Sequence, residues 1–176
     1  MMIRFDGMKS EEWRAMCTPI NEVLPADERS RRGALYIGSW LASADTELLD
    51  SYKIRQIVAV LDSEMARIPP SNGRSAYNIP IADSVCADLR PYLEGACRCI
   101  SDSLAKGNNV LVHCQQGISR SAAIVVAYLM REKGMGYDEA LQAVRSKRLC
   151  VKPNAGFEST LRDWEKELRH KRPFIL

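Results

Sequence analysis

The chain has 176 residues, 46% of them hydrophobic, which is enough for one domain with a sizeable core. Its net charge of +3 is too small to indicate nucleic-acid binding. The six cysteines form no CxxC pair, and only two histidines are present. We therefore expect no metal, no cofactor and a reducing compartment, the cytoplasm or alternatively the nucleus. The longest apolar run, residues 122–130, is too short to cross a membrane, and neither a signal peptide nor a myristoylation site is expected.

Predicted strands and helices alternate along the chain. Strands are predicted at 35–37, 56–61, 76–81 and 110–113, and helices at 43–52, 89–106, 121–133, 137–147 and from 154 to about 170. The helix at 121–133 is apolar on all sides, which is typical of a helix at the centre of a domain. The alternation predicts an α/β fold with a mixed, mostly parallel central sheet flanked by helices. Residues 1–33 give a less clear pattern, with a short helix expected at 11–17.

The segment HCQQGISRS, residues 113–121, lies between a predicted strand and the apolar helix. A loop at a helix N-terminus offers unpaired N–H groups and a positive dipole end, so it favours an anion. The same field favours the thiolate of Cys114, the form in which a cysteine is a nucleophile. The planar fork of Arg120 matches two phosphoryl oxygens. The segment therefore predicts a phosphate site built around a nucleophilic cysteine.

Phosphoryl transfer to a cysteine also needs a group that protonates the leaving oxygen, a role typically worth roughly 10²–10⁴-fold in rate. Asp83 directly follows the predicted strand 76–81 and is the candidate, with a turn or helix-capping role as its alternative. Asp62 and Asp88 are rivals. We interpret Asp62 as a turn or supporting residue and Asp88 as the cap of the next helix.

The nonapeptide resembles the signature loop of the cysteine-dependent protein tyrosine phosphatases, and its Ser-Arg-Ser ending resembles the dual-specificity branch. The segments LYIGS (35–39), IPIAD (79–83), AYLM (127–130) and PNAGF (153–157) resemble family segments in order and spacing. Gln116 departs from the more common alanine, and Leu149 from a common proline. The resemblance implies a protein tyrosine phosphatase-like fold, with a catalytic domain at 34–172, an N-terminal extension at 1–33 and a tail at 173–176.

The resemblance also implies roles for the residues of the motif. Cys114 forms a phosphocysteine, Asp83 acts as acid and then as base, Arg120 binds the phosphoryl group, and Ser121 donates a hydrogen bond to the thiolate. His113 orders the loop and is not a metal ligand, since no partner histidine lies at ligand spacing. The remaining members of the phosphate-binding loop are Gln115, Gln116, Gly117, Ile118 and Ser119. Asn154 holds the loop, caps the last helix, or does both.

The implied activity is hydrolysis of phosphotyrosine and of phosphoserine or phosphothreonine in proteins, by a monomer that uses no metal. Residues 65–78 lack the basic-aromatic loop of phosphotyrosine-only relatives, which favours a shallow pocket. Two alternatives stay open: a phosphatase of phosphoinositides, RNA 5′-phosphates or glucans, and a phosphopeptide-binding module with weak turnover. A rhodanese-like sulfur transferase is disfavoured by Asp83 and the Ser-Arg-Ser ending.

Two further hypotheses concern residues around the motif. Arg148 and Lys152 flank the connection into Pro153 and are expected to form a basic rim that attracts a second negative charge on the substrate. The alternative is a solvated helix end whose cations complement the helix dipole. Cys86 or Cys150 is a candidate redox partner for Cys114, with inert structural cysteines as the alternative.

Overall fold

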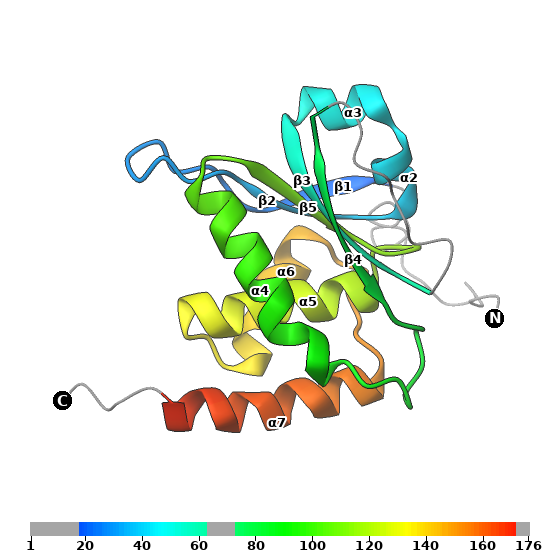
Figure 1. Cartoon of the computed structure of the whole chain (residues 1–176). Coiled ribbons are helices and arrows are strands. Elements are labelled where there is room, and N and C mark those ends of the chain that lie inside the picture. The colour runs from blue at the N-terminus through cyan, green and yellow to red at the C-terminus, as the bar shows by residue number, and fades with distance from the viewer. Residues whose placement is uncertain (1–17, 63–72, 172–176) are drawn as a thin grey trace.

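A computed structural model describes residues 18–62 and 73–171 (Figure 1). Within these ranges one five-stranded sheet has the order β1-β2-β5-β3-β4. The strands are β1 (Ile20–Leu24), β2 (Leu35–Gly38), β3 (Ile54–Leu61), β4 (Ser75–Pro80) and β5 (Asn109–His113). β1 pairs antiparallel with β2, and all the other neighbours are parallel. The predicted α/β fold with a mixed, mostly parallel sheet is confirmed.

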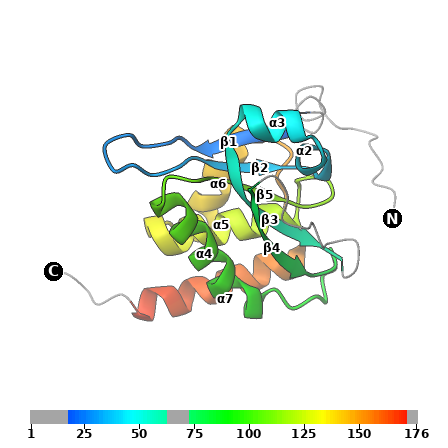
Figure 2. The same cartoon turned by 45° about the horizontal axis from the view of Figure 1, so that its top comes forward.

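Helices cover both faces of this sheet (Figure 1, Figure 2). The helices are α2 (Trp40–Ala44), α3 (Thr46–Ser51), α4 (Arg90–Ala105), α5 (Arg120–Lys133), α6 (Tyr137–Lys147) and α7 (Ala155–Lys171). Side chains alternate between the faces of a strand, so β2 sends Leu35 and Ile37 into the larger core and Tyr36 into the smaller one. The larger core lies against α4 to α7, and the smaller one against α2 and α3. No helix of the described ranges is long and apolar enough to span a bilayer.

Helix α5 lies at the centre of the domain, as its all-round apolar sequence predicted. Every residue from Arg120 to Met130 is buried. The strand before it, β5, is equally central, since it pairs with β2 on one side and β3 on the other. The loop that joins β5 to α5 therefore starts and ends on packed elements, which restricts its conformations.

Two regions differ from the sequence-based expectation or go beyond it. The single helix expected at 43–52 is two short helices, because the extended backbone of Asp45 ends α2 and its carboxylate caps α3 by accepting a 2.9 Å bond from Leu48 N. The N-terminal segment, whose structure the sequence left open, supplies β1 with the buried side chains Ile20 and Val23. The helix expected at 11–17 lies outside the described residues.

The three parallel strands β3, β4 and β5 bring the polar residues together at one edge of the sheet. Asp62 follows β3, Asp83 lies three residues beyond β4, and Cys114 follows β5. The carboxyl ends of neighbouring parallel strands meet at the same edge, which is where open α/β sheets bind ligands. Asp88, the other rival carboxylate, lies one residue before Leu89, the N-cap of α4, and accepts a 3.0 Å bond from Arg90 N.

Candidate active site

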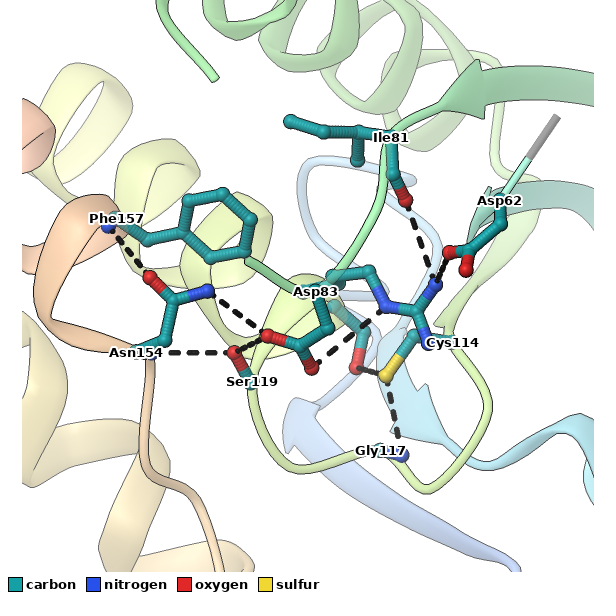
Figure 3. A network of polar contacts seen from close by, with 10 residues as sticks. Asp62, Ile81, Asp83, Cys114, Gly117, Ser119, Asn154 and Phe157 are labelled. Atoms are coloured by element: carbon teal, nitrogen blue, oxygen red, sulfur yellow. Dashed lines mark hydrogen bonds and ion pairs between the residues drawn. The ribbon is translucent and has the colours of Figure 1, made fainter. Parts of the chain in front are cut away.

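The sulfur of Cys114 lies at the base of the loop before α5 and accepts two hydrogen bonds. Gly117 N and Ser121 Oγ each donate to Sγ at 3.2 Å (Figure 3). Both Cys114 and Ser121 are buried, with 2% and 0% of their surface exposed. Two donors on one sulfur, at the positive end of a helix dipole, stabilise negative charge on that sulfur. The arrangement suits a thiolate nucleophile.

The loop turns its carbonyl groups outward. Four successive carbonyl oxygens accept hydrogen bonds from other parts of the protein: Gln115 O from Trp40 N (3.2 Å), Gln116 O and Gly117 O from Arg148 (3.0 and 2.8 Å), and Ile118 O from Lys152 N (2.8 Å). In a planar trans peptide the N–H points away from the C=O, so the N–H of each following residue faces the opposite side. The inner side of the loop is thus lined with N–H donors, which is an anion site.

Only glycine fits at position 117. Its φ is +70°, and an added Cβ would lie 2.6 Å from Gly38 O. The positive φ strains any other residue, and the contact with the Gly38 carbonyl leaves no room for a side chain. Gly117 therefore lets the loop turn tightly against the end of β2 while its own N–H reaches the sulfur.

Arg120 is held by hydrogen bonds at Nη1, and its buried Nε has no hydrogen-bond acceptor among the described residues. Its Nη1 donates to the carboxylate of Asp62 and, at 3.4 Å, to the carbonyl of Ile81. Its Nε is buried, makes no hydrogen bond within the described structure and lies 3.7 Å from Asp83 Oδ2. A planar guanidinium held at Nη1 presents its Nε edge as a fork. An incoming oxyanion would satisfy the donor that this edge leaves unpaired.

Asp83 accepts hydrogen bonds at one oxygen and faces Arg120 with the other. Ser119 Oγ and Asn154 Nδ2 both donate to Oδ1, at 2.6 and 2.9 Å (Figure 3). Asn154 also caps α7, because its Oδ1 accepts a 3.0 Å bond from Phe157 N. One amide side chain thus joins the last helix to the carboxylate, while Oδ2 faces Arg120.

Comparison with known proteins identifies this arrangement. The model of the dual specificity phosphatase catalytic domain matches residues 35–167. The human protein named dual specificity protein phosphatase 22 is 36% identical over 152 residues, which cover 86% of this chain and 77% of that protein. Dual specificity protein phosphatase 1B of Arabidopsis thaliana is 38% identical over 136 residues, covering 77% of this chain and 80% of that protein. This chain belongs to the dual specificity phosphatase family.

Solved structures agree with the sequence comparison. The crystal structure of human DUSP28 superimposes with a TM-score of 0.76 at 32% identity, covering 86% of this chain and 95% of that one. The protein tyrosine phosphatase-like fold implied by the sequence is therefore confirmed, and the protein is a phosphatase that acts on phosphorylated proteins.

The structure of this phosphatase brings most of the predicted site residues together. Cys114 and Ser121 share a hydrogen bond, and Asp83 joins Arg120 to Asn154 in a second bonded group beside them. His113 is wholly buried at the end of β5, and burial lowers its pKa to about 4, so its imidazole is neutral at pH 7. Residues 18–62 and 73–171 contain no group of three side chains placed to hold a metal ion.

The prediction of a substrate-binding rim is corrected at Arg148. This side chain is 0% exposed and lies behind the loop, where its guanidinium bonds the outward carbonyls, so it does not contact a substrate. The rim and its alternative, a solvated helix end, both place Arg148 at the surface, but its guanidinium finds acceptors inside the protein. Lys152 is exposed, and its backbone N–H holds Ile118 O beside the loop.

Two further residues support the site with side-chain bonds: Ser119, and Asp62, which the sequence offered as a turn or supporting residue. Asp62, a rival candidate for the acid, is paired with Arg120 Nη1 instead. Ser119, expected only as a loop member, holds the acid carboxylate. The signal for Asp62 was its place after a strand parallel to β5, while Ser119 gave no signal of its own. Cys86 is exposed and Cys150 is buried.

Proposed function

We propose that this dual specificity phosphatase hydrolyses phosphoproteins through a phosphocysteine on Cys114, with Asp83 as the proton carrier and Arg120 and the loop amides as the phosphate clamp. The observation that carries the proposal is the Cys114 sulfur, which accepts bonds from a loop N–H and from Ser121 at the head of α5. The buried Nε of Arg120, beside the same loop, has no hydrogen-bond acceptor in the described part of the chain and is available to donate to a phosphoryl oxygen.

In the first step the thiolate of Cys114 attacks phosphorus and the bond from phosphorus to the leaving oxygen breaks. Asp83 gives its proton to that oxygen. Its Oδ1 is occupied by Ser119 and Asn154, so Oδ2, which faces Arg120, is the oxygen that carries the proton. Charge on the equatorial oxygens is stabilised by the loop N–H groups and by the Nε edge of Arg120.

In the second step water attacks phosphorus and the bond from phosphorus to sulfur breaks. The ionised Asp83 accepts the proton of the water, and inorganic phosphate leaves. The electron pair of the broken bond returns to the sulfur, where the hydroxyl of Ser121 donates its 3.2 Å bond. Ser121 therefore stabilises the leaving thiolate, and its loss slows hydrolysis of the intermediate more than its formation.

The proposed substrates are cytoplasmic signalling proteins that carry phosphotyrosine and phosphoserine or phosphothreonine. A shallow pocket is supported by the sequence of residues 65–78, of which residues 65–72 lie outside the described ranges. The family match at 35–167 supports a catalytic domain at 34–172. Lys152 remains the proposed rim residue, because its side chain is exposed next to the loop.

A trapping experiment tests the proposal. Brief incubation with a phosphorus-32-labelled phosphotyrosine peptide, followed by acid quenching, is expected to label wild-type protein at Cys114. Cys114→Ser should lose label and turnover while still binding the peptide, because the loop amides and Arg120 stay in place. Cys99→Ser, on α4 and outside the site, is the matched control and should keep full activity.

The outcomes separate the proposed function from its alternatives. Turnover that persists in Cys114→Ser contradicts the covalent mechanism. Tight phosphopeptide binding by wild-type protein with no turnover on any phosphate ester would make the chain a binding module. Faster turnover of phosphoinositides or capped RNA than of phosphopeptides would overturn the protein substrate.

A further inference from the structure

The side chain of Arg148 binds the outward-facing carbonyl groups of the phosphate-binding loop, on the side away from the Cys114 sulfur. This residue lies directly after α6 and is wholly buried. Its Nε and Nη2 donate to the loop carbonyls Gly117 O (2.8 Å) and Gln116 O (3.0 Å). Its Nη1 donates to Thr18 O (2.7 Å) and to Asn21 Oδ1 (2.6 Å), next to and in β1. The fork thus ties the loop to the edge of the sheet.

Within residues 18–62 and 73–171, no carboxylate pairs with the positive charge of Arg148. Its four acceptors are three backbone carbonyls and one amide oxygen, and the ion pairs of the described residues do not include it. A buried charge without a counter-ion carries a large desolvation cost. That burial lowers the pKa of Arg148, and the neighbouring Cys150 and Cys114 act in the opposite direction. A thiolate or a phosphate in the active site would supply negative charge near this buried cation.

The grip on the carbonyls also fixes the donors of the loop. The carbonyl of Gln116 and the N–H of Gly117 belong to one peptide group, and in a planar trans peptide they point in opposite directions. Arg148 holds that oxygen on the outside, and the same peptide group donates its N–H to Cys114 Sγ at 3.2 Å on the inside. The bond to Gly117 O orients the next N–H, that of Ile118, in the same way.

We infer that Arg148 is a positioning residue of the active site: it aims the loop N–H groups at the thiolate and the bound phosphate, and its buried charge stabilises both from behind. It acts through the loop and touches neither substrate nor reacting atoms. The role rests on the proposed function, since it presupposes an anionic sulfur at Cys114 and a phosphate in the loop.

The charged groups around the Cys114 sulfur lie on two different sides of the loop. In front lie Arg120 and its partners Asp62 and Asp83. Behind lies Arg148, and His113, at the end of β5, is neutral because burial lowers its pKa to about 4. Removing Arg148 thus removes the cation that donates hydrogen bonds to the outer side of the loop, while the pairing of Arg120 stays intact.

The test is the pH dependence of Cys114 alkylation by iodoacetamide, a neutral reagent, followed by mass spectrometry of the Cys114 peptide. In Arg148→Met the pH midpoint of alkylation should rise by about one unit, because a cation near the thiolate is lost. kcat/KM should fall at least about tenfold, because two loop carbonyls lose their donor. Arg148→Lys keeps the charge without the fork, so it should shift the midpoint less but still lower kcat. Lys147→Met removes an exposed charge one residue earlier and should change neither value.

Substrate pairs separate this role from direct recognition. The loss in Arg148→Met should be equal for a doubly phosphorylated peptide and its singly phosphorylated counterpart. Asn21→Ala covers the case in which Arg148→Met fails to fold, since it removes one acceptor of the guanidinium on β1 and leaves the loop untouched. It should shift the midpoint in the same direction by a smaller amount and lower kcat/KM a few-fold.

Each result has a defined consequence. An unchanged alkylation midpoint in folded Arg148→Met, or in Asn21→Ala, overturns the inference. So does a loss confined to the doubly phosphorylated peptide. If Cys114→Ser keeps its turnover, the proposed covalent mechanism fails first. A dead Cys114→Ser together with an unchanged midpoint rejects the role of Arg148 alone.

Discussion

The front and the back of the phosphate-binding loop each carry one arginine, and the two differ in how their charge is balanced. Arg120, in front, pairs with the carboxylates of Asp62 and Asp83. Arg148, behind, donates to four neutral acceptors and is wholly buried. The carboxylates in front are partly exposed, with 66% and 36% of their side-chain surface accessible.

The difference indicates different duties. A cation paired with exposed carboxylates is neutralised in the free enzyme, and a dianionic phosphate competes with those carboxylates for it. A cation held by carbonyls is fixed in place and its charge is always available to the loop. Substitutions in front should therefore change phosphate binding and chemistry directly, whereas substitutions behind should act through the loop.

The largest effect is expected for Arg120→Lys. A lysine ammonium is a point charge and does not form the two parallel bonds that the Nε edge of arginine offers to phosphoryl oxygens. We expect kcat/KM for a phosphotyrosine peptide to fall by roughly 10³-fold or more. Steady-state kinetics measure it, and the thermal unfolding midpoint serves as the folding control. A loss no larger than that of Arg148→Lys would contradict the distinction between front and back.

Asp83→Asn should have the next largest effect, and one that depends on the leaving group. Asparagine keeps an acceptor for Ser119 and Asn154 but has no proton to give, so hydrolysis of a phosphotyrosine peptide should slow by about 10²-fold. An aryl phosphate with a strongly acidic leaving group needs no proton, so its burst phase should slow much less. Equal losses for both substrates would remove Asp83 from the acid role and leave it as a partner of Arg120.

The front of the loop was largely predictable from sequence, and the back was not. Cys114, Arg120 and Ser121 lie within one short segment between a strand and a helix, so local patterns were enough to place them. Arg148 lies in a basic stretch after a helix, and that pattern is the same whether the side chain is solvated or buried. What decides between them is a pair of acceptors, Thr18 O and Asn21 Oδ1, far away in sequence.

Other parts of the fold divide in the same way. Strands β2, β3 and β5 and the central helix α5 follow from the sequence because most of their residues are apolar and buried, whereas β1 was not predicted. The break between α2 and α3 depends on the backbone of Asp45, where the sequence pattern continues without interruption. The contact of Asn154 with Asp83 joins two loops that only the folded chain brings together, although its role as the cap of α7 was foreseeable.

The smallest effect is expected for Asp62→Asn, and its direction is the informative part. Asparagine keeps an oxygen that accepts the bond from Arg120 Nη1, so the guanidinium stays oriented, but the competing negative charge is gone. The Asp62 carboxylate is 66% exposed although Arg120 is buried, so we take the value of a solvent-screened pair, about 0.2–1 kcal/mol, and inhibition by inorganic phosphate should tighten by roughly 1.5- to 5-fold. KM should fall in parallel while kcat stays nearly constant, and the gain should shrink as salt is raised.

Asp62→Ala sharpens this prediction because it removes the acceptor together with the charge. If Asp62 also orients Arg120, the alanine variant should lose kcat that the asparagine variant keeps, since Ile81 O at 3.4 Å would be the remaining partner of Nη1. Identical behaviour of the two variants would limit Asp62 to an electrostatic competitor. Weaker phosphate inhibition in Asp62→Asn would show the reverse of the expected competition. The carboxylate of Asp62 would then favour substrate binding. Arg120 and Arg148 would differ only in how deeply they are buried.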